Sequence, residues 1–124
     1  MDEKVIFQDK YNMISFEFLY LKGGYSTYEI SVATLGFSGV YNYCISESEQ
    51  INYVNRINEM IKNLNGSMEI KDCESDAFIK FYFESTMDFY VSGQLGGSWN
   101  DNILKFKFKA DQTLLYGLKR NLNM

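Results

Sequence analysis

The chain has 124 residues, of which 46% are hydrophobic and 17% aromatic, and its formal net charge is −4. These values are typical of one domain with its own core, and we expect a single domain over residues 1–124. No apolar run is long enough for a membrane span, and the acidic first residues lack the features of a signal peptide, so we expect a cytoplasmic protein. The sequence contains no histidine, which removes the commonest general base and metal ligand. We therefore expect neither a cofactor nor a metal ion.

Alternating apolar and polar residues predict strands with one buried and one exposed face in the first part of the chain. The clearest runs are Ile14–Tyr20 and Tyr28–Val32, with glycine-containing turns at Lys22–Tyr25 and Gly36–Gly39. The segment Tyr41–Ile45 continues the pattern after the second turn. This rhythm of short strands and turns indicates antiparallel neighbours in a sheet.

A helix is predicted after Ser46, where the spacing of the apolar residues changes. Ser46 and Glu49 have the spacing of a capping box, and Gly66 stands where a left-handed C-terminal cap is expected. Glu47 and Glu49 lie where the helix dipole favours acidic side chains. The predicted buried stripe of the helix consists of Ile51, Val54, Ile57, Ile61 and Leu64.

Strand-like alternation returns in Ile79–Phe83, Met87–Val91 and Leu104–Phe108. A short helix is predicted from Asp111 onward, with an apolar face of leucines: Leu114, Leu115, Leu118 and Leu122. The order is thus four strands, a helix, four strands and a short helix. It predicts an α+β fold in which a mostly antiparallel, curved sheet of about eight strands packs on one central amphipathic helix. A sandwich with the helix plugging one end is the alternative.

The two cysteines, Cys44 and Cys73, do not fit a zinc site in a chain without histidine. A disulfide between them is conceivable from the count alone. In a chain that is not exported, we instead expect reduced and partly buried thiols.

The middle of the chain is acidic, since residues 47–88 hold nine acidic side chains against four basic ones. Such a segment argues against nucleic acid as a partner and suits a basic protein partner. A solvated charged surface is the simpler interpretation. The cluster Glu69, Asp72, Glu74 and Asp76 also keeps open a remote alternative, a carboxylate-dependent hydrolase. The cluster does not fit a calcium loop, because Ala77 stands where that loop requires glycine.

Aromatic residues offer a second kind of candidate site. Trp99, the single tryptophan, lies in a glycine-rich turn, where an indole either packs over the end of the sheet or anchors a partner, and we favour packing. Tyr41 and Tyr43 share one strand face and present the same choice. A small ligand-binding or carbohydrate-binding module with a pocket at these three residues is therefore an alternative function.

Several short motifs occur in a characteristic order: Phe-Ser-Gly in Gly36–Gly39, Val-Ser-Gly-Gln-Leu in Val91–Leu95, and the segment Leu104–Leu114 with its Asp-Gln-Thr. With the capped helix between them, they resemble the WapI-like immunity proteins of bacterial polymorphic, contact-dependent toxin systems. The resemblance extends over roughly residues 25 to 122.

The resemblance implies a non-enzymatic antidote that binds and neutralises the C-terminal domain of a cognate toxin, which in such systems is frequently a nuclease. It supplies no neutralising residues, so the predicted partner-binding residues rest on charge and on the lone indole. They are Glu47, Glu49, Asp72, Glu74, Asp76 and Trp99. We expect no nucleic-acid or membrane partner, and a homodimer is compatible with the sequence.

Overall fold

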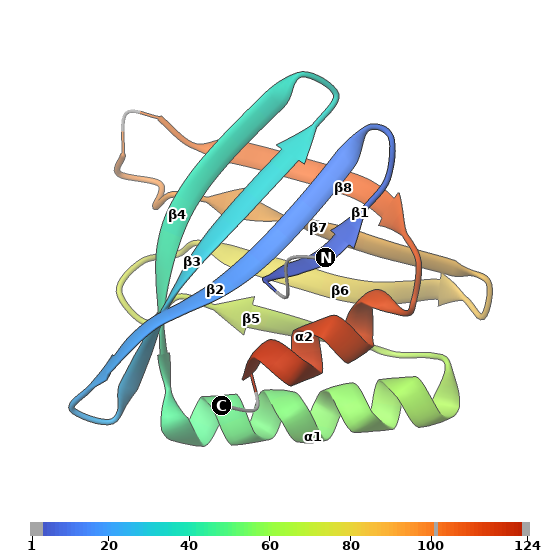
Figure 1. The fold of residues 1–124 in the computed structure, drawn as a ribbon, viewed down its shortest axis with the longest axis horizontal. Helices are drawn as coiled ribbons and strands as arrows, with labels where there is room; N and C mark the ends of the chain where they lie inside the picture. Colours follow the sequence, from blue (N-terminus) through green and yellow to red (C-terminus); the bar gives the residue numbers. More distant parts are fainter. Residues whose placement is uncertain (1–3, 101, 123–124) are drawn as a thin grey trace.

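A computed structural model describes residues 4–100 and 102–122 of the chain (Figure 1). Residues 1–3, whose acidity contributed to the expectation of an unexported chain, lie outside the described part. Within it, the elements follow the predicted order of four strands, a helix, four strands and a short helix.

The first sheet is a meander in which each strand pairs antiparallel with the next strand along the chain. Its strands are β1 (Val5–Gln8), β2 (Asn12–Lys22), β3 (Tyr25–Thr34) and β4 (Phe37–Ser46). The predicted alternation holds in β3, where every second side chain from Ser26 to Val32 is buried. One face of this sheet therefore supplies core residues, and the other faces outward.

The second sheet repeats the same meander. Its strands are β5 (Ser67–Lys71), β6 (Phe78–Ser85), β7 (Asp88–Leu95) and β8 (Leu104–Ala110). Phe106 and Phe108 of β8 are buried, while the lysines between and beside them are exposed.

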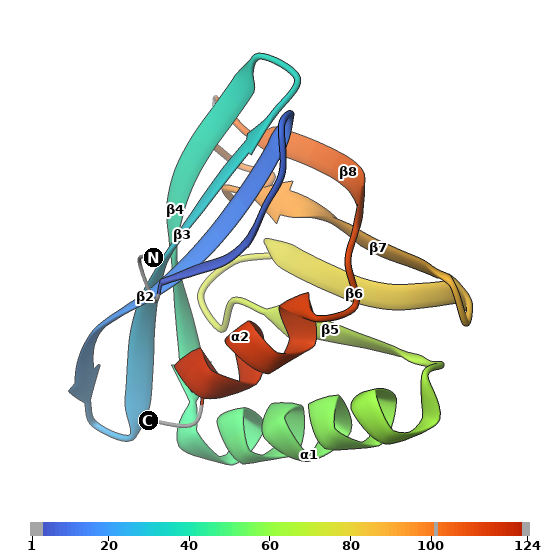
Figure 2. The same cartoon turned by 45° about the vertical axis from the view of Figure 1, so that its right-hand side comes forward.

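The predicted single sheet of about eight strands is wrong, because the strands form two separate sheets of four. The connection between β4 and β5 is the long helix α1 (Glu47–Asn63), which carries the chain away from the edge of the first sheet. The sheets converge where β4 approaches β7 and β8, and they spread apart toward the two helices (Figure 2). The arrangement is nearer to the alternative, a sandwich with a helix at one end.

Helix α1 begins as predicted, because the Glu49 N–H donates to the Ser46 hydroxyl at 3.2 Å. Its buried face, however, is rotated from the predicted stripe and consists of Gln50, Tyr53, Ile57 and Met60. Ile51 is 62% exposed. The left-handed capping residue is Leu64, with a φ of 52°, rather than Gly66. The helix thus presents a face to the core that includes a polar side chain.

Gln50 can be buried because its amide finds hydrogen-bond partners in the core. Its Nε2 donates to the Tyr28 hydroxyl at 2.9 Å and to the backbone oxygen of Leu122, and its Oε1 accepts from the Ser26 hydroxyl at 3.1 Å. Gln50 therefore connects α1 to β3 and to the last residue of helix α2.

Helix α2 (Leu114–Leu122) matches the prediction, since all four leucines of its expected apolar face are buried. The helix contacts β1, β2 and α1. It lies between α1 and the sheets in both views of the ribbon (Figures 1 and 2). In the described part of the chain, the helices are too short or too polar to cross a membrane.

Candidate functional site

Three segments that carry the predicted partner-binding residues lie along one side of the molecule. They are the first turn of α1 at the lower left of Figure 1, the loop between β5 and β6, and the turn between β7 and β8 at the upper left. Their acidic residues and tryptophan are together called the acidic edge: Glu47, Glu49, Asp72, Glu74, Asp76 and Trp99. Residues far apart in the sequence are joined here by the hydrogen bonds described next.

Asp72 attaches the loop of the second sheet to the edge of the first. Its Oδ1 accepts the Cys44 N–H at 2.9 Å and the Glu74 N–H at 3.3 Å, and its Oδ2 accepts the Ser75 hydroxyl at 2.6 Å. The side chain is only 6% exposed. Asp72 therefore acts inside the fold, and its carboxylate is already occupied by donors of this chain.

A second contact connects the end of β5 to α1. The N–H of Lys71, the last residue of β5, donates to the Tyr53 hydroxyl at 3.2 Å. Burial raises the pKa of Tyr53, and the nearby carboxylates of Glu49 and Glu69 act in the same direction. Helix α1 and the end of β5 are thus in direct contact, with acidic side chains from both elements near the Tyr53 hydroxyl.

Asp76 connects the β5–β6 loop to the turn that carries the tryptophan. Its Oδ1 accepts the Ser98 N–H at 2.8 Å, and its Oδ2 accepts the Ser98 hydroxyl. These two hydrogen bonds lower the pKa of the Asp76 carboxyl, because they stabilise its charged form. A general acid for hydrolysis needs a pKa shifted in the opposite direction, so Asp76 does not suit that role.

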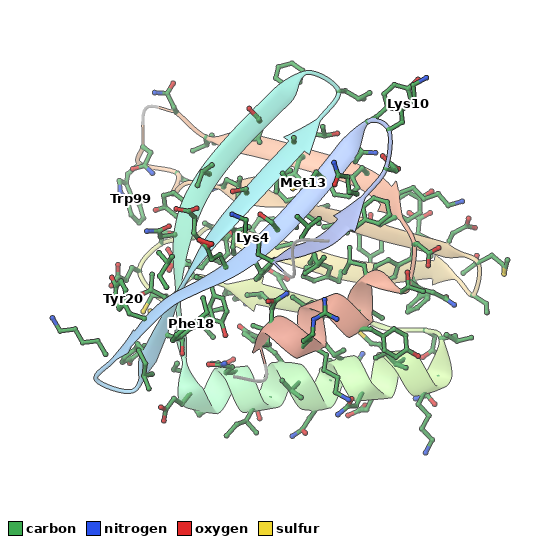
Figure 3. All side chains as sticks on the ribbon, in the orientation of Figure 1. Lys4, Lys10, Met13, Phe18, Tyr20 and Trp99 are labelled. Atoms are coloured by element: carbon green, nitrogen blue, oxygen red, sulfur yellow. The ribbon has the colours of Figure 1, made fainter. Side chains whose placement is uncertain are left out.

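Trp99 does not pack over the end of the sheet as favoured from the sequence, because its side chain is 66% exposed. Figure 3 shows it directed away from the strands at the left side of the molecule. One edge of the indole approaches Gly97, where an added Cβ would lie 3.0 Å from the ring. The indole ring thus packs against Gly97 on one edge, and most of its surface is exposed.

The two tyrosines of β4, unlike Trp99, pack in or against the hydrophobic core. Tyr43 is fully buried, and its hydroxyl donates to the backbone oxygen of Gln94 at 2.7 Å, across the two sheets. Tyr41 is half-buried and meets the Tyr43 ring edge-on, with the ring centres 6.0 Å apart. Tyr43 therefore has no free surface for a ligand.

Four members of the acidic edge keep exposed carboxylates, namely Glu47, Glu49, Glu74 and Asp76. With Trp99, they combine negative charge and a large aromatic surface, which suits a basic partner with an apolar spot. Among the described residues, no group of three or more cysteine, aspartate or glutamate side chains is arranged to hold a metal ion.

Sequence reasoning missed a hollow of about 620 Å³ between the β2–β3 hairpin and α1. Its wall is mainly apolar: Phe18, Leu21, Ile51, Val54 and Leu122, with Ser26, Glu47, Gln50 and Asn55 among the polar residues. Phe18 lies near this junction in Figure 3. The sequence gives no direct signal of this hollow, because the helical spacing predicts Ile51 in the buried stripe, whereas the structure leaves Ile51 exposed on the wall of the hollow.

No family model, no curated protein and no solved structure matches this chain.

Proposed function

We propose that this chain is an immunity protein that binds and neutralises a cognate bacterial toxin domain through the acidic edge. The observation that carries the proposal is that exposed acidic side chains and an exposed tryptophan from three separate segments lie on the same side of the molecule. The motif resemblance in Gly36–Gly39, Val91–Leu95 and Leu104–Leu114 supports it. The proposed mode of action is occlusion, in which the chain covers a basic active surface of the toxin and performs no chemistry.

Electrostatics and packing give the two parts of the proposed interface different tasks. The exposed carboxylates attract a basic surface over a distance of about 8–10 Å at physiological salt and speed association. The indole of Trp99 fits the usual role of an interface hot spot, where a large aromatic ring enters a pocket of the partner. The buried Asp72 and the exposed Asp76 support this surface by holding the two loops in place.

Charge reversal tests the proposed interface. We expect the double variant Glu47→Lys with Glu74→Lys to weaken toxin binding by about tenfold or more and to make the affinity less dependent on salt, because both acids are exposed and lose their attraction. The measurement is titration calorimetry against the cognate toxin domain, sought in the reading frame next to this one, at two salt concentrations. Protection of cells that co-express the toxin should fall in parallel.

The control is a second double variant, Glu59→Lys with Glu84→Lys, which changes the net charge equally but lies away from the acidic edge. Its ion pairs with Arg56 and Lys107 are exposed and contribute little to stability. Equal weakening by both double variants would refute the acidic edge as the site. A wild-type chain that neither binds the toxin nor protects cells would refute the function itself.

Trp99→Ala tests the apolar part of the same surface. Because the side chain is 66% exposed, we expect unfolding by urea to change little, while the affinity for the toxin falls by about 2 kcal/mol, the usual threshold for a hot spot. Unchanged affinity would place the tryptophan outside the interface.

The hollow beside α1 favours a second candidate function, the binding of a small apolar ligand. Its apolar wall and its position differ from the pocket expected at Trp99, Tyr41 and Tyr43. Val54→Trp would fill the hollow and should abolish the binding of an apolar fluorescent probe such as anilinonaphthalene sulfonate. Wild-type protein that does not enhance the fluorescence of this probe would contradict this candidate.

A further inference from the structure

The two cysteines of the chain come from different sheets and lie side by side. Cys44 is near the end of β4 in the first sheet, and Cys73 is in the β5–β6 loop of the second sheet. The Cys73 N–H donates to the backbone oxygen of Cys44 at 2.9 Å, and the Cys73 side chain is among the groups that raise the pKa of the Cys44 thiol. Both cysteines are free thiols.

We propose that Cys44 and Cys73 are a thiol pair that a low-molecular-weight disulfide, of the class of glutathione disulfide, converts into an intramolecular disulfide joining the two sheets. The resting protein holds both thiols reduced. The disulfide forms when the surroundings become oxidising, which is the usual pattern for disulfides in a reducing compartment.

The backbone geometry suits this bond. The backbone N–H of Cys73 and the backbone oxygen of Cys44 are 2.9 Å apart, so the two residues are direct neighbours, as a disulfide requires, since its Cα atoms lie within about 7 Å of each other. A second hydrogen bond holds the two cysteines close to each other. The carboxylate of Asp72, the residue just before Cys73, accepts the Cys44 N–H. Two independent hydrogen bonds therefore hold the loop against β4 while the thiols react.

The surroundings of the two thiols set the order of the steps. Cys73 is exposed, so it meets a dissolved oxidant first. Cys44 is half-buried, and burial, the Cys73 thiol and the acids Glu74 and Asp72 together raise its pKa to about 12. On the β3 side, Cys44 faces Thr27, which carries no charge. Cys44 is therefore a poor nucleophile toward a dissolved oxidant, and it reacts in the second step because the Cys73 backbone is held beside it.

The exchange balances without any other reactant. The Cys73 thiolate attacks one sulfur of glutathione disulfide and expels a glutathione thiolate, which takes up the proton that Cys73 released. The Cys44 thiolate then attacks the Cys73 sulfur, forms the Cys44–Cys73 bond and expels the second glutathione, which takes up the other proton. The two cysteines lose two electrons in total, and glutathione disulfide gains them.

The test is incubation of the purified full-length chain with glutathione disulfide, followed by alkylation of the remaining thiols and mass spectrometry. We expect wild-type protein to lose two hydrogens, about 2 Da, with no glutathione retained and no thiol left to alkylate. Dithiothreitol should reverse the change. The oxidised protein should unfold at a higher urea concentration than the reduced protein, because the bond crosses between the sheets.

Two single variants distinguish this pathway from simple surface oxidation. Cys44→Ser should retain one glutathione on Cys73, because no second thiol is present to expel it. Cys73→Ser should stay largely unmodified, since Cys44 is shielded. Circular dichroism spectra that match the wild type confirm that both variants fold. A glutathione adduct that persists on wild-type Cys73, disulfide-linked dimers, or no reaction of the wild type would each overturn the proposal.

Discussion

Asp72 is the residue whose role differs most between sequence and structure. The sequence groups it with Glu74 and Asp76 as surface charge, but its carboxylate is buried and accepts three hydrogen bonds from neighbouring backbone and hydroxyl groups. Hydrogen bonds to a charged group contribute about 1.5–3 kcal/mol each in favourable cases. The fold therefore depends on this carboxylate, whereas Glu74 is exposed and available for a partner.

Asp72→Ala should lower the free energy of unfolding by about 2–3 kcal/mol, because it leaves the Cys44 N–H without its acceptor. Urea unfolding followed by circular dichroism measures the change. The matched control is Glu74→Ala, a change at an exposed position in the same loop, which should shift stability by no more than about 0.5 kcal/mol. Equal effects of the two substitutions would contradict the structural role of Asp72.

At the scale of elements, helix α1 begins where the sequence predicts, but it buries a different face from the predicted one. Its start at Ser46 is predictable, because a capping residue and the acids of the first turn act locally. Its buried face is not, since the core uses Gln50 in place of Ile51. Hydrophobic spacing cannot identify a buried amide whose partners lie on β3 and at the end of α2.

Gln50→Ala and Ile51→Ala form an adjacent pair that tests this face of the helix. We expect Gln50→Ala to cost about 2 kcal/mol, because buried hydroxyl and carbonyl groups lose their amide partner. Ile51→Ala should cost less than about 0.5 kcal/mol, since the side chain is 62% exposed. The measurement is again urea unfolding, and a larger loss at Ile51 would restore the stripe predicted from the sequence.

The same distinction applies to the rest of the fold and to the candidate site. Strand alternation and turn glycines sufficed to place most strands and the leucine face of α2, because these signals are local. The division into two sheets could not be predicted, since it depends on where α1 leads the chain after β4. The acids of the candidate site are a prediction from charge, and the sequence does not show which of their carboxylates accept hydrogen bonds, because Asp72 and Asp76 find donors in distant segments.

At the scale of the whole molecule, the core buries groups that ionise in alkaline solution. Burial raises the pKa of Tyr28 to about 12 and shifts the pKa of Tyr43 upward as well. The unfolded chain loses these protons near pH 10, so between about pH 10 and 12 it binds fewer protons than the folded chain. By linkage, the stability that is fully present below pH 10 is lost as the pH rises through this range.

We therefore expect the free energy of unfolding to fall between about pH 10 and pH 12, measured by urea unfolding at several pH values. Tyr28→Phe should flatten this decline, because it removes one of the buried hydroxyls. Tyr116→Phe is the control, since Tyr116 is 57% exposed, and its pH profile should match the wild type. A stability that does not change over this range would refute the proposed burial of the phenols.

The strand order also has a consequence for the route by which the chain folds. Every hydrogen-bonded strand pair joins neighbours in the sequence, so each meander closes only short loops and pays little entropy to form. Contacts between the sheets, such as the hydrogen bond from Tyr43 to Gln94, span much longer stretches of chain. We expect the two meanders to form early and their docking to be the slow step, which makes the seam between β4 and the second sheet the part of the molecule that is assembled last.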